Sequence, residues 1–439
     1  MFLSREKSHT KFKKSTRLFF SRKRCLFFSF IDDFYCHPNW RRIDFRVGRR
    51  SIPLWLGSVI ISSRIMLRVC LLAMGIGKKM AQFQVSTVAQ LFEIVYQSKF
   101  LKQIASLLSI VSLFMILVAQ VIASKKFMVS MGVDQPVFFM AFWGLIIIYT
   151  VMGGLKAVVS IDIIQALFFI CVFVGGFFFV LISQESTWAL SWKNGFDAFA
   201  GDPYASKLSG WLLMPLLFMV IEQDMAQRCF AAKSPSIVTK AAACAAICTF
   251  GISIIPIFFG VLGKQMGLSI PSHSSVFIEV SKTITNPTFA AFLGCAVLMA
   301  IISTAISLLN AISSNLSQDF DFVTLDKMDG VKISRLLTTA IGVAAFLASF
   351  GFGEIVDLLI QSYELSVYCL FVPVFAAMFN KKGSSSAAFL AMGFGAIGFF
   401  LFRDLQMNFL KEMSSIGLSA IGMGLGFFWD KRQVKSQVF

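Results

Sequence analysis

Long apolar segments alternate with short polar breaks from about residue 53 to the end of the chain. Each segment is long enough to cross about 30 Å of hydrocarbon, where only helices and closed barrels satisfy their own backbone groups. Segments of this length indicate helices. The pattern therefore predicts an all-α, polytopic membrane protein with about eleven transmembrane helices. They are expected near residues 53–77, 104–125, 134–152, 160–184, 209–229, 238–262, 287–313, 333–351, 355–379, 385–402 and 413–429.

The beginning of the chain has a different pattern. Residues 1–52 hold fourteen Lys or Arg and four acidic residues, interleaved with Phe, and no apolar run long enough to span. This stretch could be a basic tail on anionic lipid, a targeting segment, or a sequence unrelated to the fold behind it. We therefore divide the chain into this basic stretch and a transmembrane domain over 53–439. Arg64 and Arg68 interrupt the first predicted helix of that domain, where an arginine is costly.

The composition favours lipid as the solvent of most of the chain. Hydrophobic residues make up 57% of it and charged residues 14%, about half the charge of a typical soluble protein. The three histidines leave little material for a zinc hydrolase, and no nucleophile, base and orienting group are visible together, so we predict no enzyme. The net charge of +17 does not indicate nucleic-acid binding, because the basic residues outside residues 1–52 stand in short clusters between apolar segments.

Those clusters predict the topology. Cytoplasmic loops carry an excess of Lys and Arg, and the inter-helix basic residues fall on one predicted side. They are Lys78, Lys79, Lys99, Lys102, Lys156, Arg228, Lys233, Lys240, Lys381, Lys382, Lys431, Arg432 and Lys435. We expect this side and the C-terminus to face the cytoplasm of a cell, with the protein in the inner membrane of a bacterium. The same alternation places residues 1–52 outside if 53–77 spans, against the positive-inside tendency.

Polar residues follow one face of the predicted helix 287–313. Ser303, Ser307, Asn310 and Ser314 are spaced four, three and four residues apart, which places them on the same side. Hydroxyl and carbonyl oxygens are suitable ligands for a small hard cation such as Na⁺. The same residues could instead serve close helix packing, with hydroxyls bonded to preceding carbonyls.

Three acids lie at or near helix ends. Asp162 follows a predicted loop around Gly153-Gly154, and it could attract a cation or complement the positive end of its own helix. Glu222 and Asp224 are two residues apart and point to different sides. Asp224 can pair with Arg228 at i+4, while Glu222 lies deeper and could face a solute cavity.

The beginning of the predicted helix 355–379 is unusually polar. Its polar residues are Glu354, Asp357, Gln361, Tyr363 and Glu364. They could line a water-filled vestibule or lie outside the membrane. Near the C-terminus, small residues predict a helix-packing face. They are Gly422, Gly424 and Gly426.

Together these motifs resemble the sodium:solute symporter family, carriers that bring sugars, amino acids, vitamins or carboxylates into cells with Na⁺. The resemblance covers roughly residues 78–439. Its motifs are Tyr149-Thr150, Gly153-Gly154, Ala157-Val158 and Asp162 through Gln165, then Gln223, Gln227-Arg228 and Ala231 through Ser234, then Ser303-Thr304 with Asp319.

The resemblance implies a fold of two inverted five-helix repeats and a sodium site on the eighth core helix. The implied ligands are the Ala300 carbonyl and the Ser303 and Thr304 hydroxyls. Asp162 matches an acidic residue near the inner sodium exit, although Ile161 stands where the family usually has Thr. Na⁺ is the implied coupling ion, and no other cofactor is expected.

The resemblance also suggests the solute site. Glu222 stands where sugar carriers of the family have Asn, which favours an amino acid or carboxylate over a sugar. Gln223, Gln361 and Tyr363 are the other candidate solute ligands. Family members begin with an extra helix and a broken first core helix, and neither is found here, so the resemblance implies a chain that is N-terminally truncated relative to the family. We therefore expect a sodium-coupled symporter; the alternative is a non-transporting remnant or membrane scaffold of the same family.

Overall fold

The computed structural model describes residues 66–83, 85–183, 205–265, 276–320, 330–352, 355–380, 383–402 and 408–436. Across these ranges the regular elements are all helices, without a strand. Six helical segments are long and apolar enough to cross a membrane. They are Lys99–Ser130, Pro136–Gly153, Pro235–Ile255, Thr288–Asp319, Gly330–Ala348 and Ser362–Phe379. The predicted all-α, polytopic membrane architecture is thus confirmed, while the basic stretch 1–52 lies outside the described residues.

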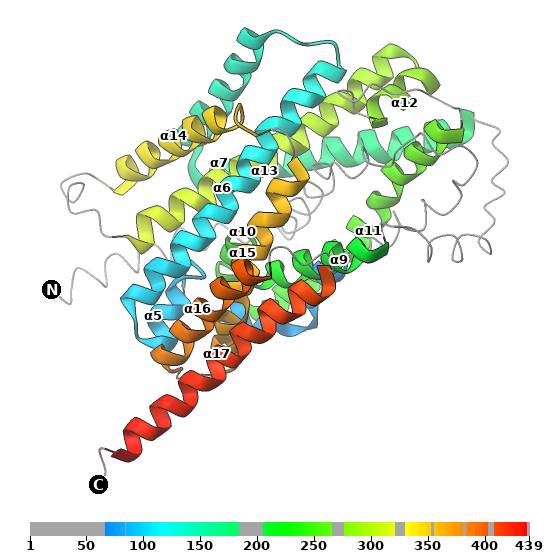
Figure 1. Cartoon of the computed structure of the whole chain (residues 1–439). Coiled ribbons are helices and arrows are strands. Elements are labelled where there is room, and N and C mark those ends of the chain that lie inside the picture. Colours follow the sequence, from blue (N-terminus) through cyan, green and yellow to red (C-terminus); the bar gives the residue numbers. More distant parts are fainter. Residues whose placement is uncertain are drawn as a thin grey trace.

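The elements follow the predicted order with several differences (Figure 1). They are η2 (Leu72–Ile76), α4 (Gly77–Met80), α5 (Gln90–Tyr96), α6 (Lys99–Ser130), α7 (Pro136–Ser183), α9 (Ala205–Ile221), α10 (Gln223–Phe230), α11 (Pro235–Gln265), α12 (Val276–Ile284), α13 (Pro287–Asp319), α14 (Gly330–Ala348), α15 (Ile355–Phe379), α16 (Ser385–Leu401) and α17 (Asn408–Ser436). The short helices α5 and α12 lie in segments that the apolar pattern left as loops.

The helix α13 lies at the centre of the molecule (Figure 1) and packs against α6, α7, α10, α12 and α14. Its first turn is well defined by sequence, because the Asn286 side chain accepts a hydrogen bond from the Phe289 amide at 2.8 Å and Pro287 occupies the first helical position. The apolar side chains of α13 join the two buried clusters of the protein. Its polar face is therefore held inside the bundle.

The long helix α7 differs from the prediction of two helices joined by a loop. We expected a loop between residues 152 and 160, but the chain stays helical from Pro136 to Ser183. No proline interrupts this stretch, and the two glycines Gly153 and Gly154 cost only about 1 kcal/mol each in a helix. A straight helix of 48 residues would extend about 70 Å, far more than one bilayer crossing. Figure 1 shows that α7 changes direction along its course.

Contacts between distant segments agree with the predicted sides of the membrane. On the side that carries most inter-helix lysines, here called the lysine-rich side, the Gly383 amide donates to the Val95 carbonyl at 2.9 Å. On the opposite side, the Lys282 ammonium donates to the Ser130 carbonyl at 2.7 Å. Each contact joins ends that the loop alternation assigns to the same side. These two contacts agree with the predicted alternation, whereas the continuous helix α7 replaces the loop that was expected between residues 152 and 160.

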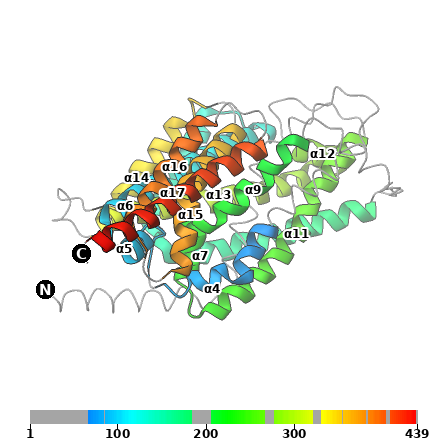
Figure 2. The ribbon, with the colours of Figure 1, turned by 60° about the horizontal axis from the view of Figure 1, so that its bottom comes forward.

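The first described helical turns are distorted. Residues 66–71 are helical, η2 follows as a π-helical turn, and Gly75 adopts φ +130°, a conformation that L side chains rarely adopt. Figure 2 shows α4 lying beside α11. A methyl group on Gly77 would stand 2.8 Å from Val238 of α11, so glycine permits this close approach.

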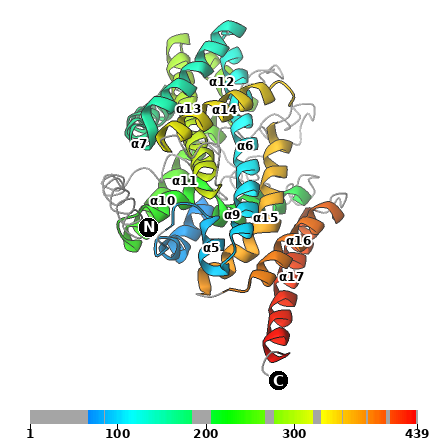
Figure 3. The same ribbon diagram turned by 90° about the vertical axis from the view of Figure 1, so that its left-hand side faces the viewer.

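The helices α16 and α17 pack along their length (Figure 3). Their contact depends on glycine, because a methyl group on Gly426 would stand 2.2 Å from the Cα atom of Ala387. Gly422 faces α16 in the same way, whereas nothing lies within 4 Å of a methyl group on Gly424. Two of the three glycines thus form the predicted packing face.

Candidate functional site at the break between α9 and α10

The chain stops being helical at one residue in the middle of the predicted helix 209–229. Helix α9 ends at Ile221, Glu222 has an extended backbone with φ −66° and ψ 115°, and α10 begins at Gln223. The prediction of one continuous helix here is wrong. A break inside a bundle leaves backbone groups outside the helical ladder and brings side chains to places that a straight helix cannot reach.

Glu222 forms a buried ion pair at this break. Its Oε2 atom lies 2.8 Å from the Nη2 atom of Arg68, and the two side chains are 10% and 2% exposed. Arg68 also approaches the sulfur of Met219, at 3.9 Å. In the sequence, Arg68 appeared only as a costly interruption of the first predicted helix. An arginine within an apolar run, however, also indicates a buried acidic partner. Its partner is the acid that we predicted to lie deepest.

Asp224 has a different arginine. Its Oδ1 atom lies 3.4 Å from Arg228 Nη2, which confirms the predicted i+4 pair. The same guanidinium donates to the Ser307 hydroxyl of α13 at 2.8 Å. The two acids beside the break therefore face different sides, as their spacing predicts, and each is neutralised. Arg228 joins α10 to the polar face of α13.

The Gln223 side chain links the break to the segment 85–89 by two hydrogen bonds. Its Oε1 atom accepts a hydrogen bond from the Val88 amide at 2.7 Å, and its Nε2 atom donates to the Ser86 carbonyl at 3.1 Å. Both contacts use backbone groups that belong to no helix. The predicted solute ligand Gln223 is thus engaged with the protein itself in this conformation.

The predicted sodium ligands lie together on α13. Ala300, Ser303 and Thr304 are buried, at 8%, 6% and 7% exposure. The Thr304 hydroxyl donates to the Ala300 carbonyl at 3.3 Å, which is the backbone bond expected if these residues serve packing. Ser307, which contacts Arg228, is about one helical turn from Ser303 and Thr304, which lie roughly 5–6 Å along the helix from the α10 contact, and about two turns from Ala300.

The other predicted residues lie on different elements. Tyr363 of α15 is buried, and its ring packs against Phe218 of α9 with centroids 4.6 Å apart. This contact brings α15 to the helix that precedes the break. Gln361 and Asp162 belong to the helical stretches of α15 and α7, and their side chains lie outside the described residues.

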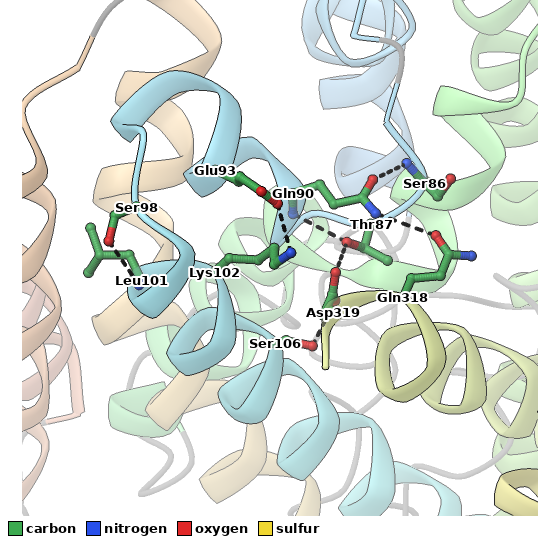
Figure 4. Close-up of polar contacts among 10 residues, drawn as sticks. All are labelled: Ser86, Thr87, Gln90, Glu93, Ser98, Leu101, Lys102, Ser106, Gln318 and Asp319. Atoms are coloured by element: carbon green, nitrogen blue, oxygen red, sulfur yellow. Dashed lines mark hydrogen bonds and ion pairs between the residues drawn. The ribbon is translucent and has the colours of Figure 1, made fainter. Parts of the chain in front are cut away.

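A second polar cluster closes the lysine-rich end of α13 (Figure 4). Asp319, 2% exposed, accepts hydrogen bonds from the Thr87 hydroxyl at 2.8 Å and the Ser106 hydroxyl at 2.7 Å. Next to it, Gln90 Nε2 donates to Gln318 Oε1 at 3.5 Å. The segment 85–89, α6 and α13 therefore meet at one carboxylate. Asp319 belonged to the motif block read from the sequence, but Thr87 and Ser106 carried no signal, because ordinary hydroxyls far apart in sequence become partners only in the fold.

This geometry suits selective binding. Two buried ion pairs, amide groups and a row of hydroxyls surround a helix break, all on elements that other helices hold in place. Among the described residues, no group of three or more His, Cys, Asp and Glu side chains is placed to hold a metal ion. Neutral hydroxyl oxygens, the kind that Ser303 and Thr304 carry, are in general ligands that release alkali ions readily.

Comparisons of the sequence with known proteins find sodium-coupled symporters. The sequence model of the sodium:solute symporter family matches residues 55–395. A sodium/proline symporter of Haemophilus influenzae is 26% identical over 287 residues, which are 59% of this chain and 56% of that protein. The chain thus spans little more than half the length of this curated relative.

Two solved structures share the fold. A Na⁺-coupled sialic acid symporter, in a substrate-bound outward-open state, superposes with a TM-score of 0.63 at 18% identity, covering 90% of this chain and 89% of that one. A nucleobase-cation-symport-1 family transporter in a closed conformation, with bromovinylhydantoin bound, gives a TM-score of 0.56 at 14% identity, with 92% of each chain covered. At these identities the similarity is one of fold.

Proposed function

Because the chain belongs to the sodium:solute symporter family, we propose that it is a secondary active transporter, a carrier and not an enzyme, that moves a small organic solute across the membrane together with Na⁺. The observation that carries this proposal is the break at Glu222. Broken helices in transporters present backbone groups and half-helix ends to solutes and ions near the bilayer midplane. Here the break lies against the hydroxyl-bearing face of α13 through the Arg228–Ser307 bond.

We assign the sodium site to the Ala300 carbonyl and the Ser303 and Thr304 hydroxyls. The Thr304 hydroxyl uses its hydrogen in the bond to Ala300, so its lone pairs remain available to a cation. Neutral oxygen ligands of this kind replace the hydration shell of a hard cation. From the family resemblance, Asp162 of α7 would attract the ion at its inner exit.

The solute class follows from the charges at the break. Arg68 can bind a carboxylate through two parallel hydrogen bonds, and Glu222 can bind an ammonium group, so the pair suits both charged groups of an amino acid. A sugar uses neither charge. The amino acid named for the Haemophilus influenzae relative agrees with this class. Gln223, Gln361 and Tyr363 would complete the site with amide and hydroxyl groups.

We also propose that the lysine-rich side and the C-terminus face the cytoplasm, in the inner membrane of a bacterium. The excess of Lys and Arg on that side supports this orientation. In that orientation the Thr87–Asp319–Ser106 cluster closes the cytoplasmic end of α13, and it must open for the solute to leave toward the cell interior.

Solute-induced stabilisation of the purified protein tests the proposal. The melting temperature is measured with a panel of amino acids, carboxylates and sugars, in Na⁺ and with Na⁺ replaced by K⁺. We expect an amino acid or carboxylate to raise the melting temperature only in Na⁺, because the two ligands bind the same state. Stabilisation by a sugar would contradict the solute class, and equal stabilisation in both salts would contradict the coupling.

Variants on α13 test the ion site in the same assay. Ser303→Ala and Thr304→Ala should each raise the Na⁺ concentration for half-maximal stabilisation by about tenfold, equivalent to about 1.4 kcal/mol. Ser313→Ala is the matched control, because the Ser313 hydroxyl bonds to Leu309 and Thr338, toward α14. An unchanged sodium requirement in both site variants would remove the assignment.

A further inference from the structure

One carboxylate lies buried in the contact of α15, α16 and α17, away from the break. Glu412, on the first turns of α17, is 1% exposed. Its Oε2 atom has no hydrogen-bond partner, whereas the other glutamates with described side chains each form an ion pair. An ionised carboxylate is costly in such surroundings unless it is paired.

The nearest cation is already used. Lys411 donates to both carboxylate oxygens of Glu364 on α15, at 2.7 Å each. Glu364 is close enough to repel a negative charge on Glu412. Among the side chains that the structure describes, the contact therefore holds two carboxylates and one ammonium group, which is one negative charge in excess.

In the described part of the chain, the remaining neighbours supply no second cation. Tyr368 of α15 is fully buried, and its hydroxyl lies beside the Ser415 hydroxyl of α17 and within electrostatic range of Glu412. Helix α16 has no titratable side chain. Helix α9, which also contacts α17, has one charged residue, Lys207, whose side chain lies outside the described part of the chain. A proton is the smallest ligand that removes the excess charge.

We propose that Glu412 binds a proton and occupies the contact between α15 and α17 as a neutral carboxylic acid, and that deprotonation loosens this contact. The neutral acid can donate its proton in a hydrogen bond to a nearby oxygen such as the Tyr368 hydroxyl, which gives the buried carboxyl group of Glu412 a partner. The site is separate from the proposed solute and sodium ligands. It makes the packing of α15, which also carries Tyr363, sensitive to pH.

The pH dependence of stability tests this proposal without any solute. A carboxyl group that binds its proton more tightly in the folded state stabilises that state at low pH and loses the contribution as the pH rises. The melting temperature of the wild type should therefore fall between mildly acidic and alkaline pH, and the fall should be clearly smaller in Glu412→Gln. Glu93→Gln is the matched control, because it removes a carboxylate from the more exposed Lys102 pair and should keep the wild-type slope.

Two results would overturn the proposal. Equal pH slopes in the wild type and Glu412→Gln would show that Glu412 stays ionised. Stabilisation by Na⁺ or K⁺ at constant pH that disappears in Glu412→Gln would assign the position to a metal cation. Should Glu412→Gln fail to fold, infrared spectra of wild-type protein with ¹³C-labelled glutamate decide the matter. We expect a protonated glutamate band at neutral pH that vanishes at alkaline pH, and its absence at neutral pH contradicts a bound proton.

Discussion

The α9–α10 break and the α16–α17 pair hold their helices by opposite means. At the break, the contacts are charged and directional, with Arg68 on Glu222 and Arg228 on Asp224. Between α16 and α17, the backbones approach through glycine at positions such as Gly426. Directional polar contacts can be exchanged for contacts to a ligand, whereas interlocked backbones cannot. The comparison separates a region suited to binding from one suited to support.

Removal of one charge at the break should have the largest effect. Arg68→Ala deprives the buried Glu222 of its arginine, so we expect the free energy of unfolding to fall by about 3–5 kcal/mol. The double variant Arg68→Met with Glu222→Gln should recover much of this loss, because no charge is then buried alone. Chemical denaturation in detergent measures all three proteins. Equal losses in the single and double variants would show that packing, and not charge, holds the break.

A surface ion pair provides the contrast for that experiment. Lys102 and Glu93 are also 2.7 Å apart, but their side chains are 14% and 38% exposed. Lys102→Ala should cost at most about 1 kcal/mol.

A methyl group between α16 and α17 should have the next largest effect. Gly426→Ala places a Cβ atom 2.2 Å from the Cα atom of Ala387, so the helices must shift, at a cost of about 2–3 kcal/mol. Gly424→Ala is the matched control, since nothing lies within 4 Å of its added methyl group. Thermal unfolding measures the loss of stability in each of the two variants. Equal melting temperatures for the two variants would disprove the glycine contact.

Loss of one hydroxyl at the lysine-rich end should have a smaller effect than the arginine and glycine changes. Thr87→Val removes a hydrogen bond to Asp319, which keeps its bond from Ser106, and we expect a loss of about 1.5 kcal/mol. Thr339→Val serves as the control, because the exposed Thr339 hydroxyl bonds only to the backbone carbonyl of Arg335 in its own helix. If Thr87→Val lowers the free energy of unfolding no more than the control does, the Thr87–Asp319 hydrogen bond does not stabilise this end of the bundle.

The sequence predicted most of the helices, because hydrophobicity over about twenty residues reports directly on a lipid environment. The apolar pattern did not show whether a long hydrophobic stretch forms one continuous helix or two helices separated by a break. The break at Glu222 is not marked by proline or glycine, and the helical path through Gly153 is not interrupted despite both glycines. In both places tertiary packing outweighs local propensity.

The candidate site was predictable in part. The Asp224–Arg228 pair follows from i+4 spacing, which is local. The Arg68–Glu222 and Thr87–Asp319 contacts join residues 154 and 232 positions apart, and no periodicity in one sequence reveals such partners. Charge balance is the useful remaining signal, because each buried charge requires an opposite one nearby.

Gradient-driven uptake tests the proposed transport most directly. Purified protein is reconstituted into liposomes, and the accumulation of radiolabelled amino acids, carboxylates and sugars is followed with an inward Na⁺ gradient, without a gradient, and with a sodium ionophore. We expect at least one amino acid or carboxylate to accumulate above its outside concentration only while the Na⁺ gradient lasts, and Ser303→Ala to need more Na⁺ for the same rate. No accumulation of any solute with the gradient in place would contradict sodium-coupled transport.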